Sequence, residues 1–437
     1  MATVATVISI AVMGQRAGES LVKAEISAEN GRAGSNYLAY PGPQQEQLTP
    51  APEGYVPFYI SHYGRHGSRF LIDTMDYVRP IQVLQRADSA GVLTEEGRDV
   101  LRRVRRMYAE SYKRWGELTQ LGAEQHRGIA RRMYERFPEV YADSAEIDAK
   151  STVVIRCILS MENELLQLAA MNPDLRIVHD ASEHDMYYMN QPDKQLDSLK
   201  RLPAVNDAFR AFCARHSHPA RLMRVLFSDK KYVKRNVDGG QLSSALFSLA
   251  TALQNTELRK KMTLYDVFTD DELYEHWQMS NAWWYMHYCS TPLNGGTQPY
   301  SQRNLLSNII AQADSCIALS KDGWHGATLR FGHETMVLPL TCLLNLNGFG
   351  KEVASPDDLE KEGMVLYRVF PMAANIQFVF YRQRNVDSPI LFKVLLNENE
   401  ATLPLPADFA PYYRWADFRT YYLQKLDDYR FSSNESK

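Results

Sequence analysis

The hydrophobic pattern predicts strands and helices that alternate through most of the chain. Short apolar runs, typical of buried strands, recur between stretches whose apolar residues are spaced three or four positions apart, as on one face of a helix. The expected strands are residues 55–60, 327–332, 375–381 and 390–396, and the last two are typical of an antiparallel pair. The expected helices are residues 94–112, a segment that ends at Pro138, a segment that follows residues 151–160, and residues 305–319 and 336–346.

A different pattern fills the middle of the chain. Residues 183–297 lack strand-like runs and place aromatic and charged residues at helical spacing, so we predict a mostly α-helical cap there. The alternating elements on either side predict one α/β domain of residues 55–182 and 298–437. Residues 23–54 are polar and rich in Gly, Pro, Gln and Glu, which is typical of a peripheral N-terminal arm.

The first residues predict export. Residues 2–14 form an apolar run that is too short to span a membrane permanently but suits the hydrophobic part of a signal peptide, which we place within residues 1–22. No Lys or Arg precedes Arg16, so an ordinary buried strand is the alternative. No other segment of the sequence reaches membrane-spanning length. We therefore expect a mature chain without an integral membrane segment, either periplasmic or secreted.

Composition limits the partners that the chain can have. The 437 residues carry a net charge of −3, which argues against a nucleic-acid partner, so any affinity for a polyanion must come from a local basic pocket. The five cysteines are scattered, and none has the spacing of a zinc site. Buried free thiols are the expected state of most of them. We expect no metal, no cofactor and a monomer.

One polar turn follows the first predicted strand and combines basic groups with a nucleophile. Its residues are Arg65, His66, Gly67, Ser68 and Arg69. Two guanidinium groups can hold phosphate oxygens bidentately, glycine lets backbone N–H groups approach a ligand, and the imidazole can attack phosphorus. A basic surface turn without a ligand is the alternative interpretation of these five residues taken alone.

Two distant segments are candidates to complete a phosphate site. Arg156 lies in the apolar stretch 151–160, where a charge needs a partner, either a bound phosphate or a core carboxylate in a structural ion pair. A later strand ends at His333, Glu334 and Thr335, and α/β sheets place their sites at the carboxyl ends of strands. A surface strand end is the alternative interpretation of His333 and Glu334.

The turn Arg65-His66-Gly67-Ser68-Arg69 resembles the RHGxR signature of the histidine phosphatase superfamily, in its histidine acid phosphatase (phytase-like) branch. Patches of resemblance run from about residue 55 to residue 405, with the cap largely unmatched. Within that branch, the segment with Arg156, Cys157 and Ser160 is most similar to the multiple inositol polyphosphate phosphatases. The resemblance implies a phosphoglycerate-mutase-like sheet domain with helices on both faces and a helical cap insertion.

The resemblance also implies roles for the candidate residues. His66 is the implied nucleophile, and the implied phosphate-binding residues are Arg65, Arg69, Arg156 and His333. Acid phosphatases of this family usually carry His-Asp at the distal motif, whereas the multiple inositol polyphosphate phosphatases carry His-Ala-Glu. Here Glu334 is the only carboxyl group beside the distal histidine, so it is the expected proton donor, with Thr335 as a secondary candidate.

The function expected from these residues is hydrolysis of phosphomonoesters through a phosphohistidine, with inositol polyphosphates such as phytate as substrates. One alternative is a broad-specificity acid phosphatase that acts on sugar phosphates or nucleotides. The other is a non-catalytic protein of the same fold that binds a phosphorylated ligand. A mutase of the same superfamily is disfavoured, because those enzymes are compact and lack a cap of this size.

Overall fold

One mixed sheet crosses the part of the chain that the structure, a computed structural model, describes: residues 20–190, 192–383 and 388–435. Its strand order is β3-β2-β4-β1-β5-β6-β7, and β8 pairs with β6. Strands β3, β2, β4 and β1 are parallel, whereas β5, β6 and β7 each run antiparallel to the preceding strand in this order. The strands are β1 (Tyr55–Arg65), β2 (Glu146–Ser151), β3 (Arg176–Asp180), β4 (Gly326–Gly332), β5 (Asn375–Gln383), β6 (Leu391–Leu396), β7 (Asn399–Ala401) and β8 (Tyr413–Arg414).

Helices make up most of the rest. They are α1 (Leu21–Ala28), α2 (Met75–Ser89), α3 (Glu95–Ser111), α4 (Gln120–Arg136), α5 (Ile155–Met171), α6 (Met186–Met189), α7 (Lys194–Leu199), α8 (Pro203–His216), α9 (Ala220–Leu226), α10 (Lys230–Asn236), α11 (Gly239–Leu253), α12 (Asp270–Tyr288), α13 (Arg303–Leu319), α14 (Glu334–Leu344) and α15 (Trp415–Glu435). Within the described residues, none of the helices is both long enough and apolar enough to cross a membrane. All five cysteines are free thiols, and all except Cys213 are buried.

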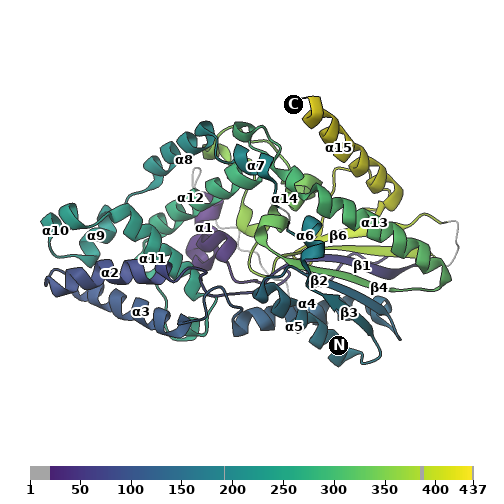
Figure 1. Cartoon of the computed structure of the whole chain (residues 1–437), viewed down its shortest axis with the longest axis horizontal. Helices are drawn as coiled ribbons and strands as arrows, with labels where there is room; N and C mark the ends of the chain where they lie inside the picture. Colours follow the sequence, from purple (N-terminus) through teal and green to yellow (C-terminus); the bar gives the residue numbers. More distant parts are fainter. Residues whose placement is uncertain (1–19, 191, 384–387, 436–437) are drawn as a thin grey trace, which may run out of the picture.

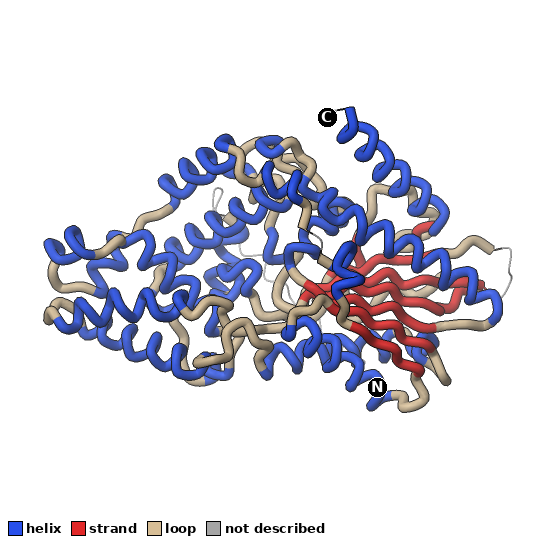
Figure 2. The backbone as a smooth tube through the Cα atoms, in the orientation of Figure 1, coloured by secondary structure: helices blue, strands red, loops and turns tan. Residues whose placement is uncertain are grey.

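Helices cover both faces of the sheet (Figure 1 and Figure 2). Successive side chains of a strand point to opposite faces. In β1, Tyr59 and Tyr63 accordingly pack in a core that includes residues of α13, α14 and α15, whereas Ile60 packs with residues of α4 and α5. The α/β class and all four expected strands are confirmed. The predicted signal peptide within residues 1–22 lies, apart from residues 20–22, outside the described residues.

A second core, the helical core, is built mostly from helices and lies at the other end of the molecule from the sheet (Figure 1). Leu84 of α2, Leu249 of α11 and Trp277 of α12 are among its buried residues. Burial of a large apolar side chain stabilises a fold by roughly 1.5–3 kcal/mol, so this cluster holds its helices together independently of the sheet. Helix α2 comes from residues 55–182 and the other two from residues 183–297, so the helical core combines both ranges.

The peripheral arm predicted for residues 23–54 is in fact packed against the protein in its first part. Residues 21–37 fold into α1 and the 3₁₀ helix η1 (Asn30–Tyr37), and Val22 and Ile26 are buried in the helical core. These two apolar residues are four positions apart and therefore share one face of the helix. The polar composition of the segment hid this short apolar face.

The turn that follows β1 packs directly on the start of α4. A Cβ atom at Gly122 would lie 2.3 Å from the carbonyl oxygen of Ser68, and one at Gly67 would lie 2.5 Å from the carbonyl oxygen of Gly122. Backbone atoms cannot move aside as the end of a flexible side chain can. Glycine is therefore required at both positions to bring the turn and the helix together.

We expect Gly122→Ala to destabilise the fold by about 1–3 kcal/mol, as overpacking does, and to displace the turn at residues 65–69. The midpoint of urea-induced unfolding measures the first effect. Gly128→Ala on the same helix is the control, because its new methyl group would meet only the side chain of Arg132 and alanine favours helix over glycine by up to about 1 kcal/mol. Equal unfolding midpoints for the two variants would contradict this contact.

Candidate active site

The carboxyl ends of three neighbouring strands meet at one place on the sheet edge. Arg65 ends β1 and pairs in register with Gly332, which ends β4, and β2 lies on the other side of β4. The pairing of β1 with β4 continues for one more residue, because the backbone N–H of His66 donates to the carbonyl oxygen of Gly332 at 2.9 Å. The residues that follow the three strands, namely His66, His333 and Thr152, are thereby brought together.

His66 is fully buried, and one contact fixes the state of its ring. Its Nδ1 lies 2.9 Å from the carbonyl oxygen of Gly67, which can only accept, so Nδ1 carries the hydrogen. Nε2 then presents a lone pair and has no hydrogen bond among the described residues. Gly67 is held in turn by Ser160, whose Oγ accepts its backbone N–H at 3.1 Å.

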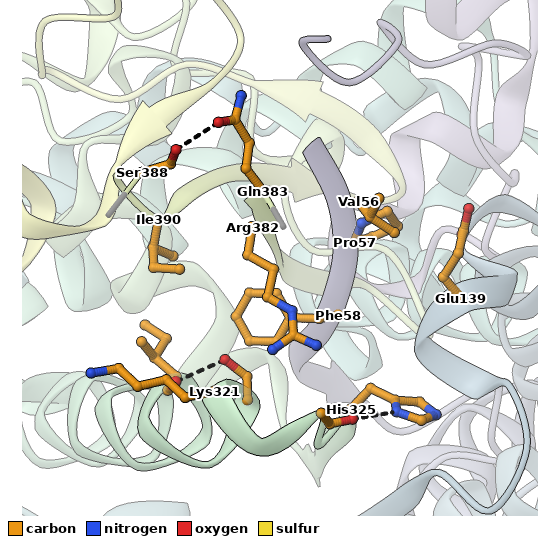
Figure 3. A pocket seen from close by; sticks show the side chains of 13 residues that line it. Val56, Pro57, Phe58, Glu139, Lys321, His325, Arg382, Gln383, Ser388 and Ile390 are labelled. Carbon is orange, nitrogen blue, oxygen red and sulfur yellow. Dashed lines mark hydrogen bonds between the residues drawn. The ribbon is translucent and has the colours of Figure 1, made fainter. Parts of the chain in front are cut away.

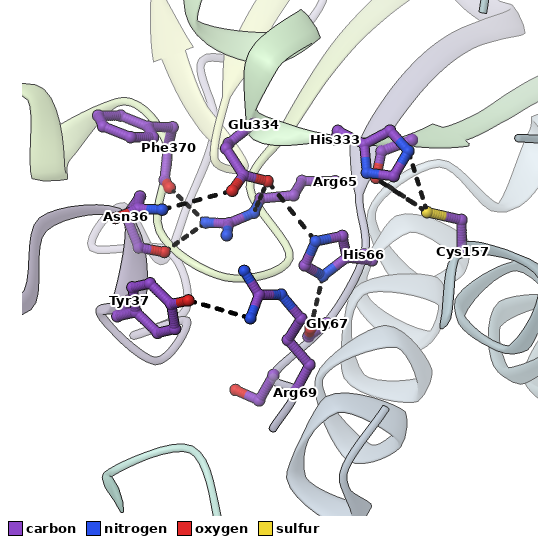
Figure 4. A network of polar contacts seen from close by, with 12 residues as sticks. Asn36, Tyr37, Arg65, His66, Gly67, Arg69, Cys157, His333, Glu334 and Phe370 are labelled. Carbon is purple, nitrogen blue, oxygen red and sulfur yellow. Dashed lines mark hydrogen bonds and ion pairs between the residues drawn. The ribbon is translucent and has the colours of Figure 1, made fainter. Parts of the chain in front are cut away.

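Arg65 is a fully buried cation (Figure 4). Its Nη1 donates to the carbonyl oxygens of Asn36 at 2.5 Å and Phe370 at 2.8 Å, and its Nε forms an ion pair with Oε2 of Glu334 at 3.0 Å. Nη2 has no hydrogen-bond partner in the described chain. Burial lowers the pKa of Arg65 to about 10, so the guanidinium stays charged at neutral and acidic pH.

Two further arginines bring more positive charge. Arg69 stacks on the ring of Tyr37, 4.9 Å from its centroid, and its Nη1 donates to the hydroxyl of Tyr37 at 3.1 Å. Arg156 lies in the first turn of α5 and is half-buried, and no carboxylate pairs with it in the described ranges. Burial, and the charge of Arg69, lower the pKa of Arg156. The structural ion pair considered as the alternative role of Arg156 is thus absent from the described residues.

His333 and Glu334 lie at the start of α14. His333 is the N-cap residue, and Glu334 opens the first turn, where the helix dipole favours a carboxylate. Oε2 of Glu334 lies 3.5 Å from Nε2 of His66, and Oε1 accepts a hydrogen bond from Nδ2 of Asn36 at 3.3 Å. Nε2 of His333 lies 3.3 Å from the hydroxyl of Thr152.

The structure gathers all the predicted site residues except Thr335. That residue accepts a hydrogen bond through its carbonyl oxygen from Gln302, and no described hydrogen bond joins its hydroxyl to the arginines or histidines of the site. Sequence reasoning missed Asn36, Tyr37 and Thr152. Thr152 directly follows a strand and could have been found from that position, whereas the polar segment around Asn36 carries no such signal.

The electrostatics favour a neutral His66 beside an ionised Glu334. Burial, reinforced by Arg65, holds the pKa of His66 well below its ordinary value, although Glu334 acts in the opposite direction. For Glu334, burial alone would raise the pKa, but Arg65, His66 and Arg69 outweigh burial and hold that pKa well below its ordinary value. Burial lowers the pKa of His333 to about 4. Three guanidinium groups and one carboxylate leave an excess of positive charge, which attracts an anion.

A profile of the histidine phosphatase superfamily (branch 2) matches residues 64–397, a range that contains the three arginines, both histidines and Glu334. The chain belongs to this superfamily. It is therefore a phosphatase, as the sequence predicted. A search of curated protein sequences returned no significant match. Asn36 and Tyr37 lie outside the matched residues.

Solved structures share the fold of this histidine phosphatase. The multiple inositol polyphosphate phosphatase of Bifidobacterium longum in complex with inositol hexasulfate superposes with a TM-score of 0.73 at 19% identity, covering 88% of this chain and 96% of that one. The phytase from D. castellii gives a TM-score of 0.59 at 14% identity and coverages of 91% and 85%. The apo phytase of Hafnia alvei gives 0.52 at 15% identity and coverages of 86% and 98%. These likenesses confirm the predicted fold.

The site also contains atoms of the kind that bind metal ions. Ligand atoms of His66, His333 and Glu334 all lie within 4.8 Å of one another. However, Nε of Arg65 contacts the same carboxylate, and the neighbouring guanidinium groups repel a divalent cation. The donor set of this histidine phosphatase therefore suits an anion better than a metal ion.

Figure 3 shows the lining of a separate cavity of about 500 Å³. Its residues at the start of β1 place it at the opposite end of the sheet from His66. Phe58, near the start of β1, lines it together with Lys321, His325 and Arg382. A strand rises about 3.3 Å per residue, which places Phe58 roughly 25 Å from His66. This cavity is therefore remote from the arginines of the site.

We expect inorganic phosphate to stabilise the protein against heat, since a ligand at 100 times its Kd adds about 2.7 kcal/mol to the free energy of unfolding. Arg156→Ala removes a cation without a carboxylate partner, so the phosphate-dependent rise in Tm should shrink severalfold, while Tm without phosphate stays the same or rises. Differential scanning fluorimetry measures both. The control is Arg102→Ala, which truncates an exposed side chain of α3. An undiminished rise in Arg156→Ala would exclude phosphate binding by Arg156.

Proposed function

We propose that this phosphatase hydrolyses phosphomonoesters through a phosphohistidine formed on His66, with inositol polyphosphates as its substrates. The observation that carries the proposal is the neutral ring of His66, whose Nε2 has no hydrogen bond among the described residues and lies in the same site as Arg65, Arg69 and Arg156. A lone pair among fixed cations can attack phosphorus while the cations hold the phosphate oxygens.

In the first step, Nε2 of His66 forms a bond to phosphorus, and the bond between phosphorus and the leaving oxygen breaks. The three guanidinium groups hold the equatorial oxygens, and the neutral ring of His333 adds a donor. The leaving oxygen takes a proton from Glu334. The carbonyl oxygen of Gly67, which contacts Nδ1, stabilises the positive charge that develops on the ring.

In the second step, a water molecule attacks phosphorus on the side that the leaving group has vacated. Glu334, now ionised, takes a proton from this water, and the bond between phosphorus and Nε2 breaks. Inorganic phosphate departs, and His66 returns to its neutral state. One carboxyl group thus serves as acid and then as base. In the ligand-free site Glu334 pairs with Arg65 again and ionises, so it must gain a proton anew when the next substrate binds.

The carboxylate of Glu334 must move before this cycle can begin, because in the ligand-free site it lies where the substrate phosphate would bind. Its Oε2 lies 3.5 Å from Nε2 of His66, close to the distance of about 3–3.5 Å at which reacting atoms must approach. The carboxylate and the incoming phosphate therefore compete for Arg65 and for the same space. Phosphate that displaces the carboxylate also takes away its cation, which raises the pKa of Glu334. A monoester that still holds a proton, since the second pKa of such phosphates is about 6, can supply the proton at acidic pH.

Positive charge near the site supports a substrate with several phosphates. The loop between α3 and α4 passes beside Arg156, because a Cβ atom at Gly116 would lie 3.5 Å from its Nη1. The same loop carries Arg114, which pairs with Glu117, and Lys113, for which no ion pair is found within the described ranges. The shared fold with a multiple inositol polyphosphate phosphatase, solved in complex with inositol hexasulfate, also supports a polyanionic substrate.

A broad-specificity acid phosphatase is the second candidate. The apolar side chains of Ile72 and Ile155 are 55% and 67% exposed. Ile72 lies beside Gly116 and Ile155 precedes Arg156, so both border the same loop. An apolar border suits the leaving group of a small monoester better than it suits phytate.

We also propose that the phosphatase is exported, because the apolar run at residues 2–14 suits a signal peptide. This run lies outside the described residues. Activity should appear in the periplasm or the medium of the producing cells, with the apolar run at residues 2–14 removed from most of the isolated chain. A cytoplasmic enzyme that keeps its first residues would argue against export.

We expect phosphate release from phytate to exceed release from p-nitrophenyl phosphate at about pH 4–7, without added metal, and His66→Ala to reduce both by at least about 10³-fold. Radiolabelled substrate quenched in alkali should leave an acid-labile label on the wild type and none on the variant. His218→Ala is the control, because that histidine is exposed and pairs with Glu275.

The other possible outcomes of this assay each favour an alternative function or exclude the phosphohistidine. Preference for p-nitrophenyl phosphate, with the same loss in His66→Ala, would favour the broad-specificity phosphatase. Binding of phytate without release of phosphate would favour a non-catalytic protein. Release that survives His66→Ala would exclude the phosphohistidine.

A further inference from the structure

One residue of the N-terminal segment contacts both Glu334 and Arg65. Asn36 lies in η1, is 7% exposed, and is far from both residues in the sequence. Its side-chain Nδ2 donates to Oε1 of Glu334 at 3.3 Å, and its carbonyl oxygen accepts from Nη1 of Arg65 at 2.5 Å (Figure 4). We propose that Asn36 is a positioning residue, which orients the carboxyl group of Glu334 for proton transfer. This inference rests on the proposed function, in which Glu334 protonates the leaving group.

Two hydrogen bonds hold the backbone that directly follows Asn36. The carbonyl oxygen of Tyr37 accepts a hydrogen bond from Nδ2 of Asn255 at 2.8 Å, and that of Leu38 accepts one from the backbone N–H of Met372 at 2.8 Å. Ser35 is buried at φ 53° and ψ −115°, a conformation that residues other than glycine rarely adopt. Such a conformation costs about 1–3 kcal/mol and persists only where the surroundings impose it. The segment is therefore fixed against the site.

The chemistry of the amide decides which oxygen of Glu334 carries the proton. An amide N–H can only donate, so Oε1, which receives it, is best suited to be the carbonyl oxygen when the carboxyl group is neutral. Nε of Arg65 donates to Oε2 in the ligand-free site, so Oε2 can carry the proton only once phosphate has taken that donor. It is then the oxygen that faces Nε2 of His66 and hence the phosphoryl group. Asn36 thus selects the proton-bearing oxygen.

The same bond persists when the other partner of Glu334 is lost. In the ligand-free site Nε of Arg65 holds Oε2. Phosphate oxygens compete for this donor when substrate enters, whereas the bond from Asn36 to Oε1 involves no group that binds phosphate. The carboxyl group can then pivot about Oε1 while Oε2 moves from Arg65 toward the leaving oxygen. Asn36 therefore guides the movement that the proposed cycle requires.

The test compares two esters that differ in their need for an acid. Nitrophenolate leaves without a proton, whereas the alkoxide of glycerol 2-phosphate needs one, and a general acid contributes about 10²- to 10⁴-fold. We expect Asn36→Ala to lower kcat/KM for glycerol 2-phosphate by about 10- to 100-fold, a part of that contribution, and to leave p-nitrophenyl phosphate within about 3-fold. Asn30→Ala is the matched control, because Asn30 lies in the same 3₁₀ helix and donates to Ile26 instead.

A second variant, Asn36→Asp, tests the pH dependence of kcat/KM, which would not change if the role of Asn36 were purely structural. Asn36→Asp keeps the shape of the side chain and the carbonyl that Arg65 contacts, but it places a second carboxylate beside Glu334. Two carboxylates that share a site raise one pKa. The acid must be protonated to act, so activity is lost as pH rises through its pKa. We therefore expect the alkaline limb of the kcat/KM profile for glycerol 2-phosphate to move to higher pH in Asn36→Asp.

Glu334→Gln, measured with the same two esters, separates this inference from the proposed function. We expect it to show the same difference between the esters as Asn36→Ala, but larger. If Glu334→Gln shows that difference while Asn36→Ala lowers both esters equally or neither, the positioning inference is overturned and the proton donor stands. If Glu334→Gln shows no difference, the proton donor and the inference both fail. Should Asn36→Ala not fold, an unchanged alkaline limb in Asn36→Asp overturns the inference.

Discussion

The ion pair between Arg65 and Glu334 is the interaction on which the site depends. It joins the end of β1 to the start of α14, and the parallel register of β1 and β4 brings these two points together. A buried guanidinium without an anion would cost several kcal/mol, and two more arginines lie nearby. The carboxylate offsets that charge in the ligand-free fold. The positive site is therefore stable enough to exist before a phosphate arrives.

The same ion pair links stability to function. In the proposed cycle Glu334 holds the place that a phosphate oxygen would take, and the cations and their carbonyl partners are already arranged around an anion. Arg65 also donates to the carbonyl oxygens of Asn36 and Phe370, and neither bond involves the carboxylate. Substrate binding, as proposed, would then exchange one anion for another within an existing arrangement of donors. Preorganisation of this kind is the main source of electrostatic catalysis.

Most of the fold and the centre of the site could be predicted from the sequence, because both depend on local signals. Apolar runs and helical spacing gave β1, β4, β5 and β6, and the turn at residues 65–69 and the pair His333 and Glu334 follow strands directly. Strand β2 (Glu146–Ser151) was missed because polar residues alternate along it and its exposed side chains dilute the apolar signal. The sequence predicted only part of the helical core, because α2 joins this core through tertiary packing that no local pattern reveals.

The contribution of Asn36 could not be predicted for a different reason. The role proposed for it comes from two contacts across the fold, one made by its side chain and one by its backbone carbonyl. A carbonyl oxygen carries no sequence signal at all. The segment around it is polar, as an exposed arm would be, because its polar groups bind Arg65, Glu334, Arg69 and Asn255 rather than water. Polar composition in a segment that flanks a charged site is therefore as consistent with burial against that site as with exposure. A buried polar segment can be told from an exposed one by asking whether charged groups elsewhere in the chain lack partners. In this chain they do, because Glu334 alone cannot neutralise the cluster of Arg65, Arg69 and Arg156.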